Sequence, residues 1–247
     1  MTLQDFFNAH PKAAVAFSGG VDSAYLLAEA LRCGADVRPY CAFTAFQPAF
    51  ERREAEALCA SFGVELVTVE LDILAVPVVA ANPPDRCYHC KTALFTALMA
   101  RAAEDGYRLI LDGTNASDDA SDRPGMRALG ELGVLSPLRL CGLTKAEIRR
   151  RSRELGLPTW DKPAYACLAT RVPTGEPIDR EKLERVERAE EALRDLGYSD
   201  LRVRLWHGEA RLQLPGAQLP RAAAERETIR RALAPWFQTV LLDLEER

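Results

Sequence analysis

The chain has 247 residues, 48% of them hydrophobic, and its formal net charge at pH 7 is −4. This length allows one large domain or a larger and a smaller one, and the apolar content is sufficient for a core. With a pI near 5.6, the chain lacks the basic footprint of proteins whose main partner is a long nucleic acid. Residues 1–7 contain neither a basic segment nor a long apolar run, so we expect a cytoplasmic protein without a membrane anchor.

A glycine-containing loop, Ser18-Gly19-Gly20-Val21-Asp22-Ser23, separates an apolar run at 13–17 from a segment with helical spacing at 24–31. The pattern predicts a strand, a tight turn and the start of a helix. Glycines let the backbone approach a ligand, and the free N–H groups of a helix start favour an anion. The spacing is neither GxxxxGK[ST] nor GxGxxG. We interpret the loop as a phosphate cradle; the alternative is a plain turn capped by Asp22 or Ser23.

Strand and helix patterns continue in alternation. Residues 37–43 are predicted as a second strand, in which Pro39 favours an edge position or a strand start. An apolar stripe over 55–62 predicts a helix that Gly63 closes, and 64–71 alternates as a third strand. Residues 108–111 are predicted as a fourth strand. The alternation indicates an α/β fold with a doubly wound, mostly parallel sheet and a ligand crevice at the carboxyl ends of its strands.

Polar residues directly follow two of these predicted strands. Thr44 follows residues 37–43, and the cluster 112–118, which contains Asn115, follows residues 108–111. Because the carboxyl ends of parallel strands line the crevice of such a sheet, we expect Thr44 and Asn115 beside a nucleotide. The alternatives are a plain turn at Thr44 and an Asx-rich loop at 112–118.

The seven cysteines are an odd number scattered through the chain, which argues against a disulfide framework. Four of them are interpreted as structural, because free cysteine behaves as a small buried hydrophobe: Cys33, Cys41, Cys59 and Cys141. Cys87-Tyr88-His89-Cys90 precedes a helical pattern over 91–105. A helix N-terminus lowers the pKa of thiols, which suits metal ligation or redox chemistry. One CxxC supplies only two of the four ligands of a zinc site.

The region from 123 to 175 combines ordinary helix signals with one unusual loop. A helix is predicted to open at 123–125 and to end by 132, and residues 137–140 are predicted as strand-like. Thr144 and Glu147 have the spacing of a capping box for a helix over 145–155, on which Arg149–Arg151 is interpreted as a solvated face. Residues 162–175 have no period and are rich in small residues, Pro and Gly. Such loops tend to be functional, and Cys167 lies at the centre of this one.

The pattern changes near Thr170, where we place a boundary between domains 1–170 and 171–247. The second domain is predicted as a small α/β domain with a mostly antiparallel sheet, built from helices at 179–196 and 220–233 and strands at 201–206, 211–214 and 240–244. Glu190 falls on the apolar stripe of the first helix, where a carboxylate costs free energy unless it is paired or used. Arg202 and Arg204 share one face of a strand. They repel each other unless an anion lies between them, and arginine suits phosphate; a solvated amphipathic strand is the alternative.

Six segments together resemble the LarE family of PP-loop sulfur transferases, over most of the chain: SGGVDS at 18–23, GTNASD at 113–118, RPG at 123–125, SPL at 136–138, LTKAEI at 143–148 and PAYACLATR at 163–171. The resemblance implies a PP-loop ATP pyrophosphatase domain of the adenine nucleotide alpha hydrolase type with a smaller C-terminal domain. It implies that ATP adenylates the carboxylates of pyridinium biscarboxylic acid mononucleotide, releasing pyrophosphate and AMP, and that sulfur then replaces oxygen. The product serves nickel-pincer nucleotide (lactate racemase cofactor) biosynthesis. A homo-oligomer, often a hexamer, is also implied.

The resemblance assigns roles to individual residues. The ATP phosphates would lie on Ser18, Gly19, Gly20, Asp22 and Ser23, with Asp22 near magnesium. Thr44 and Asn115 would flank the nucleotide. Glu190, Arg202 and Arg204 would lie on the substrate side, with the arginines facing the phosphate of the mononucleotide. Thr170 and Thr174 stand where the family commonly has a serine and a tyrosine.

The family uses two sulfur sources. One branch sacrifices the sulfur of the cysteine that matches Cys167, and the other adds a CxxC and resembles cluster-bearing enzymes that relay sulfide. Three thiolates, from Cys87, Cys90 and Cys167, suit a 4Fe-4S cluster with one iron left open for a sulfide or another sulfur donor. The presence of Cys87 and Cys90 favours the cluster branch.

Two other functions are considered. PP-loop tRNA thiolases also combine a CxxC with a third cysteine, but the acidic pI and the lack of further CxxC pairs or an RNA-binding appendage argue against one. An adenine-nucleotide sensor of the universal stress type would bind ATP without releasing pyrophosphate. That function would leave Cys167 and the CxxC without a role.

Overall fold

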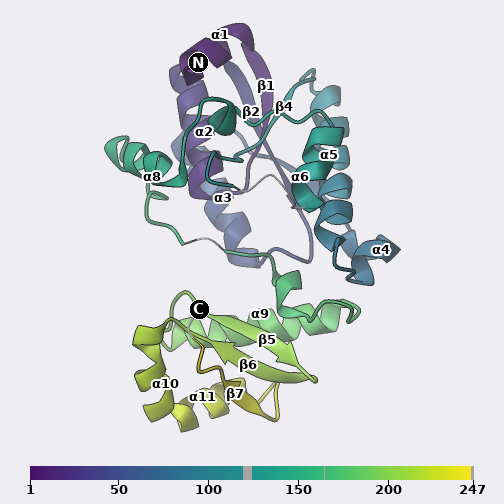
Figure 1. Ribbon diagram of the computed structural model, residues 1–247, viewed down its shortest axis with the longest axis vertical. Coiled ribbons are helices and arrows are strands. Elements are labelled where there is room, and N and C mark those ends of the chain that lie inside the picture. Colours follow the sequence, from purple (N-terminus) through teal and green to yellow (C-terminus); the bar gives the residue numbers. More distant parts are fainter. Residues whose placement is uncertain (119–123, 164, 246–247) are drawn as a thin grey trace. The chain divides into compact units, whose positions relative to one another are not determined.

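The computed structural model describes residues 1–118, 124–163 and 165–245 (Figure 1). The chain divides into two compact units, Met1–Ile73 with Asp85–Ala164, and Leu74–Pro84 with Tyr165–Arg247. The sequence placed one boundary at Thr170, whereas this division falls before Tyr165 and also assigns 74–84 to the second unit. Arg123 and Ala164, which belong to two of the sequence motifs, lie outside the described residues.

A four-stranded, all-parallel sheet forms the centre of the first unit, with the strand order β3-β2-β1-β4. Its strands are β1 (Lys12–Ala16), β2 (Asp36–Phe43), β3 (Val67–Glu70) and β4 (Ile110–Leu111). In the register of the sheet, Ala14 lies opposite both Arg38 and Ile110. The predicted α/β class and parallel sheet are confirmed. Since all four strands run the same way, the loop that follows β1 and the polar residues that follow β4 meet at one edge.

The prediction that Pro39 marks an edge position or a strand start is wrong, because β2 begins at Asp36 and pairs with both β1 and β3. The Asp36 N–H points toward β1 and donates to the Pro11 carbonyl at 2.7 Å. By the alternation of a strand, the Pro39 nitrogen points to the other side, where the pairing with β3 begins only at Tyr40. The missing N–H of the proline therefore removes no bond of the ladder.

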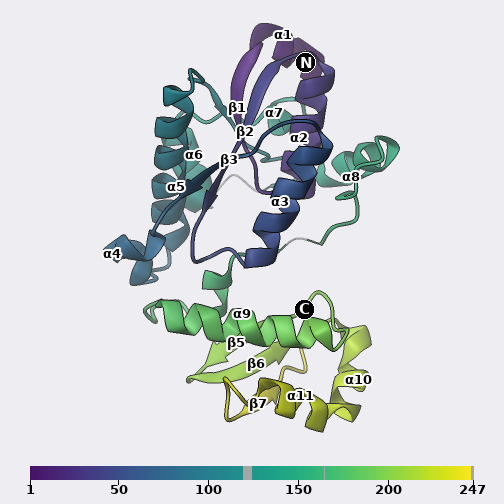
Figure 2. The same ribbon diagram turned by 180° about the vertical axis from the view of Figure 1, so that it is seen from behind.

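Helices cover both faces of this sheet, and the two opposite views agree on which ones (Figure 1, Figure 2). One face carries α2 (Val21–Arg32) and α3 (Ala49–Ser61), with α8 (Lys145–Glu154) packed against α2, and the other carries α5 (Arg86–Glu104) and α6 (Pro124–Glu131). Two clusters of buried apolar side chains fill the two interfaces, with Leu27 and Leu58 in one and Phe95 and Leu98 in the other. The predicted helices of the first unit are thus present.

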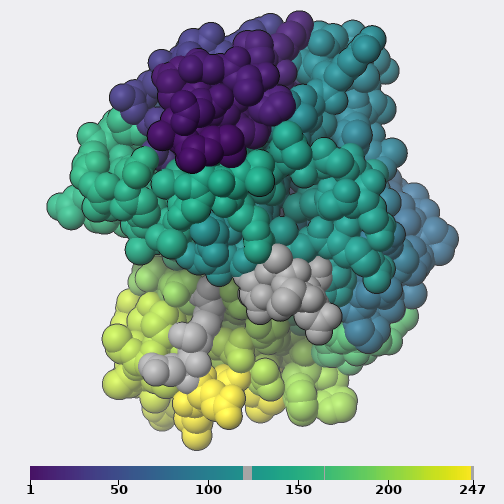
Figure 3. Space-filling view, turned by 45° about the horizontal axis from the view of Figure 1, so that its top comes forward, coloured from purple at the N-terminus to yellow at the C-terminus, as the bar shows by residue number. Residues whose placement is uncertain are grey.

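Several helix ends follow directly from local sequence. The Thr144 side chain accepts the Glu147 N–H as predicted, but the Glu147 carboxylate pairs with Arg150 and Arg151. Residues Pro137–Leu140 were expected to be strand-like and instead form the short helix α7, because proline is well suited to the first helical position. α1 (Leu3–Ala9) has a full capping box at Thr2. It forms part of the outer surface of the first unit, drawn in purple in Figure 3.

The second unit contains a three-stranded sheet with the order β5-β6-β7. β5 (Arg202–Trp206) and β6 (Glu209–Gln213) form the expected antiparallel hairpin, whereas β7 (Val240–Leu242) pairs parallel to β6. The sheet is thus half parallel and not mostly antiparallel. The other elements of this unit are the helices α4 (Pro77–Ala80), α9 (Arg180–Asp195), α10 (Leu219–Ala224) and α11 (Arg226–Leu233) and the 3-10 turns η2 (Leu168–Arg171) and η3 (Gly216–Gln218); a further turn, η1 (Ile73–Ala75), spans the division between the units.

The early segment 74–84 is joined to the second unit by specific hydrogen bonds. The side-chain amide of Asn82 donates to the carbonyl oxygens of Pro173 and Glu176 at 2.8 and 3.1 Å. The N–H of Gly175 donates to the Asn82 carbonyl at 2.9 Å, and that of Ile178 to the Ala80 carbonyl at 2.7 Å. None of the helices in the described part of the chain combines the length and apolar character needed to span a bilayer.

Candidate active site

The glycine loop forms an open helix start. Gly19 has φ +70, in the left-handed region that favours glycine, and a Cβ at this position would lie 3.2 Å from Ala55. The Ser18 N–H donates to Ser23 Oγ, which in turn donates to the Gly20 carbonyl at 3.2 Å. Gly20 is the N-cap of α2, and within the described chain no side chain caps that end. The alternative of a cap by Asp22 or Ser23 is therefore wrong, and the first N–H groups of α2 are left for a ligand.

A cavity of about 590 Å³ adjoins this loop. The residues of the loop and of the β4 end supply its polar lining, including Ser18, Gly20, Asp22, Ser23, Asp112 and Asp118. Strand β2 and helices α5 and α6 supply apolar and aromatic groups, including Tyr40, Ala42, Leu94, Phe95, Leu98 and Met126. Its size is that of a small-molecule site, and its lining can receive both an anionic and an apolar group of one ligand.

Asp22 carries a negative charge into this cavity. Its carboxylate accepts from Lys145 Nζ at 2.5 Å and from Asn115 Nδ2 at 3.4 Å. Burial raises the pKa of Asp22, and the hydrogen bond from Lys145 offsets part of this rise. The nearby negative charge of Asp118 acts in the same direction as burial. Two carboxylates facing a cavity offer the oxygen ligands that magnesium prefers.

Gly113 lets the end of β4 approach the loop. A Cβ at Gly113 would lie 3.0 Å from the Ser23 nitrogen and 3.2 Å from the Asp22 Cβ, so the backbone of the glycine loop would have to shift to admit it. The neighbouring Asp112 is buried, and it accepts hydrogen bonds from Thr114 and Ser136. This edge of the sheet is therefore held together by backbone contact and not only by side chains.

The structure places the other predicted nucleotide residues beside the cavity lining and not in it. Neither Thr44 nor Asn115 is among the described residues that line the cavity. Asn115 instead holds Asp22, and the Thr44 N–H donates to Oε1 of Gln47, which does line it. Direct nucleotide contact by Thr44 and Asn115 stays a prediction.

Sequence reasoning missed Gln47, Lys91 and Lys162. Gln47 and Lys91 line the cavity, and Lys162 Nζ donates to the Gly19 carbonyl at 3.0 Å and pairs with Glu54 at 2.7 Å. No motif links any of the three to the glycine loop. Their roles follow only from the tertiary fold.

The CxxC lies in the first turns of α5, as predicted. Cys87 is exposed and lines the cavity, and Cys90 is half-buried. All seven cysteines fall within the described residues and none of them forms a disulfide. Cys41 and Cys59 are buried as expected, and burial raises the pKa of each to about 12, which makes these two thiols unreactive.

Glu190 is the centre of a hydrogen-bond network in the second unit. Its carboxylate is 0% exposed. One oxygen accepts from Arg171 Nε at 2.8 Å and from the Val203 N–H at 3.0 Å; the other accepts from Tyr165 Oη, Arg171 Nη2 and Arg194 Nη2 at 2.5, 3.1 and 3.2 Å. The position of Glu190 on a buried helix stripe is confirmed. Its charge is compensated by the chain itself, which indicates that it positions these groups.

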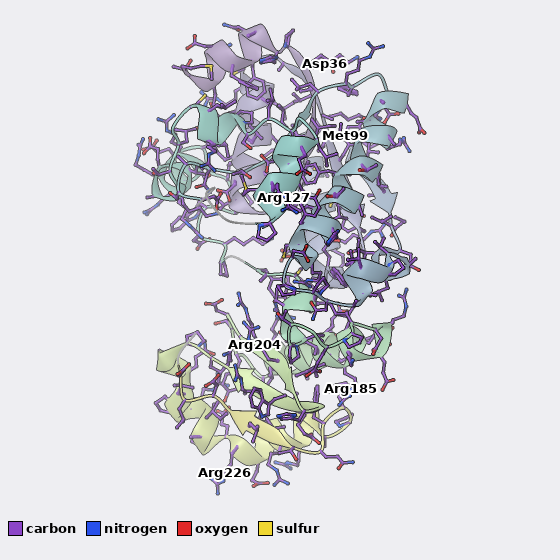
Figure 4. All side chains as sticks on the ribbon, turned by 45° about the vertical axis from the view of Figure 1, so that its right-hand side comes forward. Asp36, Met99, Arg127, Arg185, Arg204 and Arg226 are labelled. Atoms are coloured by element: carbon purple, nitrogen blue, oxygen red, sulfur yellow. The ribbon has the colours of Figure 1, made fainter. Side chains whose placement is uncertain are left out.

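Arg202 and Arg204 lie on one face of β5, with Val203 and Leu205 buried on the other (Figure 4 labels Arg204). Arg204 donates to Gln213 at 2.6 Å and to the Thr170 carbonyl at 2.5 Å. Arg202 Nε is buried and has no hydrogen-bond partner in the described parts of the chain. Burial and the positive charge of Arg171 lower the pKa of Arg202; burial and the charge of Arg202 lower that of Arg204. An anion between them would relieve this repulsion.

Cys167 belongs to the same unit as these arginines. It is the N-cap of η2 and is half-buried. Its carbonyl accepts from Thr170 Oγ1 at 2.9 Å and from Arg171 Nη1 at 3.3 Å. Negative charge on its sulfur acts to raise the pKa of both Arg171 and Arg202. Of the predicted arginines, Arg202 is therefore an electrostatic neighbour of Cys167.

These features define an α/β protein with a ligand cavity at the carboxyl ends of a parallel sheet. No family model matches the chain. The chain is 41% identical over 222 residues to an uncharacterized protein of Synechocystis sp., covering 88% of this chain and 81% of that protein. It is 28% identical over 237 residues to an uncharacterized protein of Methanocaldococcus jannaschii, covering 95% and 90%.

A third relative carries a functional name. The chain is 33% identical over 233 residues to pyridinium-3,5-bisthiocarboxylic acid mononucleotide synthase of Lactiplantibacillus plantarum, and the match covers 93% of this chain and 84% of that protein. The chain therefore belongs to the LarE family, whose named member here is a synthase, that is, an enzyme. The resemblance stated from the motifs is confirmed at the level of the family.

Proposed function

We propose that the protein is an ATP-dependent sulfur transferase of nickel-pincer nucleotide biosynthesis. It adenylates the carboxylates of pyridinium biscarboxylic acid mononucleotide and exchanges oxygen for sulfur, giving thiocarboxylates. Membership of the family supports the product, which the L. plantarum relative carries in its name. The observation that carries the use of ATP is the uncapped start of α2, which opens on a cavity with polar and apolar lining.

In this proposal the N–H groups after Gly20 bind the phosphates, and the apolar groups of β2 and α5 receive the base. Asp22 and Asp118 would hold magnesium, which would neutralise part of the phosphate charge. Lys145, which forms an ion pair with Asp22, adds positive charge at the same place. Thr44 and Asn115 support this arrangement through Gln47 and Asp22.

The chemistry has two steps. A substrate carboxylate oxygen attacks the α-phosphorus of ATP, and pyrophosphate leaves with its negative charge stabilised by the N–H groups of the helix start. A sulfur nucleophile then attacks the activated carbonyl carbon, and AMP leaves with the original oxygen. Adenylation thus makes the carboxylate oxygen, which is a poor leaving group by itself, leave as part of AMP.

The arginines of the second unit form the proposed substrate side. Arg202 and Arg204 would bind the phosphate of the mononucleotide, which explains the unpartnered Nε of Arg202. We assign Glu190 the role of a positioning residue, because its oxygens are already occupied by donors of the chain.

We propose that Cys87, Cys90 and Cys167 hold a 4Fe-4S cluster. The donor set fits, because three thiols are the ligands such a cluster needs when one iron stays open, and the accessible Cys87 faces the cavity. When bound, the cluster would carry the sulfide that is transferred. If no cluster binds, Cys167 itself is the sulfur donor. We also propose a homo-oligomer, which sedimentation of the purified protein tests.

The decisive experiment is mass spectrometry of protein and product after turnover with ATP, magnesium and the mononucleotide. We expect AMP, pyrophosphate and a product in which sulfur has replaced oxygen, with Cys167 unchanged and iron and sulfide lost from Cys87→Ala, Cys90→Ala and Cys167→Ala. If the protein contains no iron and loses the sulfur of Cys167 during turnover, Cys167 is the sulfur donor and the cluster proposal is wrong. Absence of AMP, or tight and salt-sensitive tRNA binding, would overturn the proposed function.

A further inference from the structure

A buried guanidinium group lies beside the exposed cysteine of the CxxC. Arg86 is only 7% exposed, although it is the first residue of α5, and its guanidinium carbon lies 5.7 Å from the centre of the Phe46 ring. Its Nη2 donates to Cys87 Sγ at 3.8 Å. Its Nη1 is buried and finds no hydrogen-bond partner among the residues that the structure describes.

Neighbouring carboxylates do not compensate this charge. Asp85, which precedes it, pairs with His89 at 3.2 Å, and the ion pairs of the described residues include none with Arg86. A buried charge without a partner costs free energy. An anion that bound beside Arg86 would offset this cost.

Among the residues that the structure describes, the one side chain that accepts a hydrogen bond from the Arg86 guanidinium is Cys87, which lines the cavity of the glycine loop. The N-terminal dipole of the 19-residue helix α5 and the ammonium of Lys91, which lines the same cavity, add positive potential. The positive charge of the guanidinium therefore attracts a negatively charged molecule that approaches Cys87.

We propose that Arg86 and Cys87 form the entry site for a small anionic sulfur donor, of which the hydrosulfide ion is the simplest. Arg86 is a positioning residue: its positive charge draws the anion toward Cys87, and its Nη2 donates to the cysteine sulfur. The inference deepens the proposed function and rests on it, because sulfur transfer is what gives an anionic sulfur donor a purpose.

The test compares two probes on reduced, iron-free protein without ATP or mononucleotide. The first is dithiobis(nitrobenzoate), a dianionic disulfide, and the second is dithiodipyridine, an uncharged one. The rate of modification is followed at Cys87 by peptide mass spectrometry, and the result is the ratio of the two rates. Because the thiolate fraction of Cys87 affects both rates alike, the ratio reports the attraction of the anion.

We expect Arg86→Gln to lower this ratio by at least about threefold at an ionic strength of about 0.15 M, and Arg86→Lys to retain most of it. The matched control is Arg101→Gln, which removes the same charge from the same helix about 22 Å further along its axis, well beyond the screening length of about 8 Å at physiological salt. Its ratio should equal that of the unmodified protein.

An unchanged ratio in Arg86→Gln would overturn the proposal. If that variant does not fold, the salt dependence of the unmodified protein decides: the ratio should fall as sodium chloride is raised, and a constant ratio would overturn it. Iron content and product analysis, measured separately, report on the sulfur transferase function, so the two failures are distinguishable.

Discussion

The ammonium nitrogen of Lys162 lies 3.0 Å from the carbonyl oxygen of Gly19. The loop that leads toward Cys167 therefore begins with a hydrogen bond to the glycine loop. Lys162→Met would remove this bond and a positive charge near the proposed phosphates. We expect the KM for ATP to rise about fivefold, the effect of losing one hydrogen bond of ordinary strength, with the melting temperature little changed.

The control for this variant is Glu54→Gln, which removes the ion-pair partner of Lys162 and leaves the bond to Gly19 in place. Steady-state kinetics should then give a KM close to that of the unmodified enzyme. Equal KM values for both variants and the unmodified enzyme would contradict a role of Lys162 at the loop.

Gly113 offers a test of the close approach between β4 and the loop. In Gly113→Ala the new Cβ would collide with the Ser23 nitrogen at 3.0 Å, and we expect ATP binding measured by calorimetry to weaken at least about tenfold. Gly130→Ala is the matched change, because no described atom lies within 4 Å of a Cβ there and alanine stabilises a helix by up to about 1 kcal/mol. Normal ATP binding in Gly113→Ala would refute the argument.

Asp22 links activity to stability. Burial raises the pKa of its carboxyl group, so the folded chain binds the proton more tightly than the unfolded chain. The ionised carboxylate therefore destabilises the fold, and this cost grows as the pH rises from the unfolded pKa through the folded one. Asp22→Asn should abolish ATP-dependent turnover yet raise the free energy of unfolding at pH 7 by roughly 1 kcal/mol.

Urea denaturation at two pH values checks the sign of this effect. The gain in Asp22→Asn should be larger at pH 7 than near pH 3.5, where the unmodified carboxyl group is largely protonated. A gain that is larger at the lower pH would show that the bond from Lys145 outweighs burial.

The Glu190 network predicts a large loss of stability. Glu190→Ala leaves the buried guanidinium of Arg171 without its carboxylate, which costs about 3–5 kcal/mol. Glu191→Ala, the next residue of α9, breaks only an exposed pair with Arg188 and should cost less than about 1 kcal/mol. Chemical denaturation followed by Trp fluorescence gives both values, and similar losses would mean that the network contributes little.

Substitutions of Arg202 and Arg204 are expected to differ in their effects on substrate binding and on stability. Arg204 holds Thr170 and Gln213, whereas Arg202 Nε has no partner in the described chain. We expect Arg202→Gln to raise the KM for the mononucleotide about tenfold or more without loss of stability, since like-charge repulsion is relieved. Arg204→Gln should lose both affinity and stability. Unchanged KM values in both variants would contradict the proposal that the phosphate of the mononucleotide binds at this face of β5.

Much of the first unit follows from sequence periodicity. The apolar runs before Gly19 and after Gly34, and the polar residues after Leu111, predict the strands of a parallel sheet and their common edge. Pro39 led to a wrong prediction of where β2 lies in the sheet, because local propensity contains no information on which strands pair with β2. Pro137 similarly begins a helix where the pattern suggested a strand.

The site could be predicted only where it is local in the chain. The glycine loop, the CxxC and the buried position of Glu190 follow from short patterns. Lys162 and Gln47 could not be found this way, because only the fold brings them close to the glycine loop and the cavity. Arg86 could not be found either, because the sequence does not reveal that its side chain is buried. The partners of Glu190 include Tyr165 and Arg171, which no spacing rule connects with α9.

The bonds of Asn82 make the second unit discontinuous in the chain. A fragment that starts at Tyr165 would lack the backbone and amide groups that bind Pro173, Gly175, Glu176 and Ile178. During synthesis, residues 74–84 leave the ribosome about 90 residues before these partners. An excised C-terminal piece should therefore fold poorly alone and be rescued by a peptide of residues 74–84 supplied in trans.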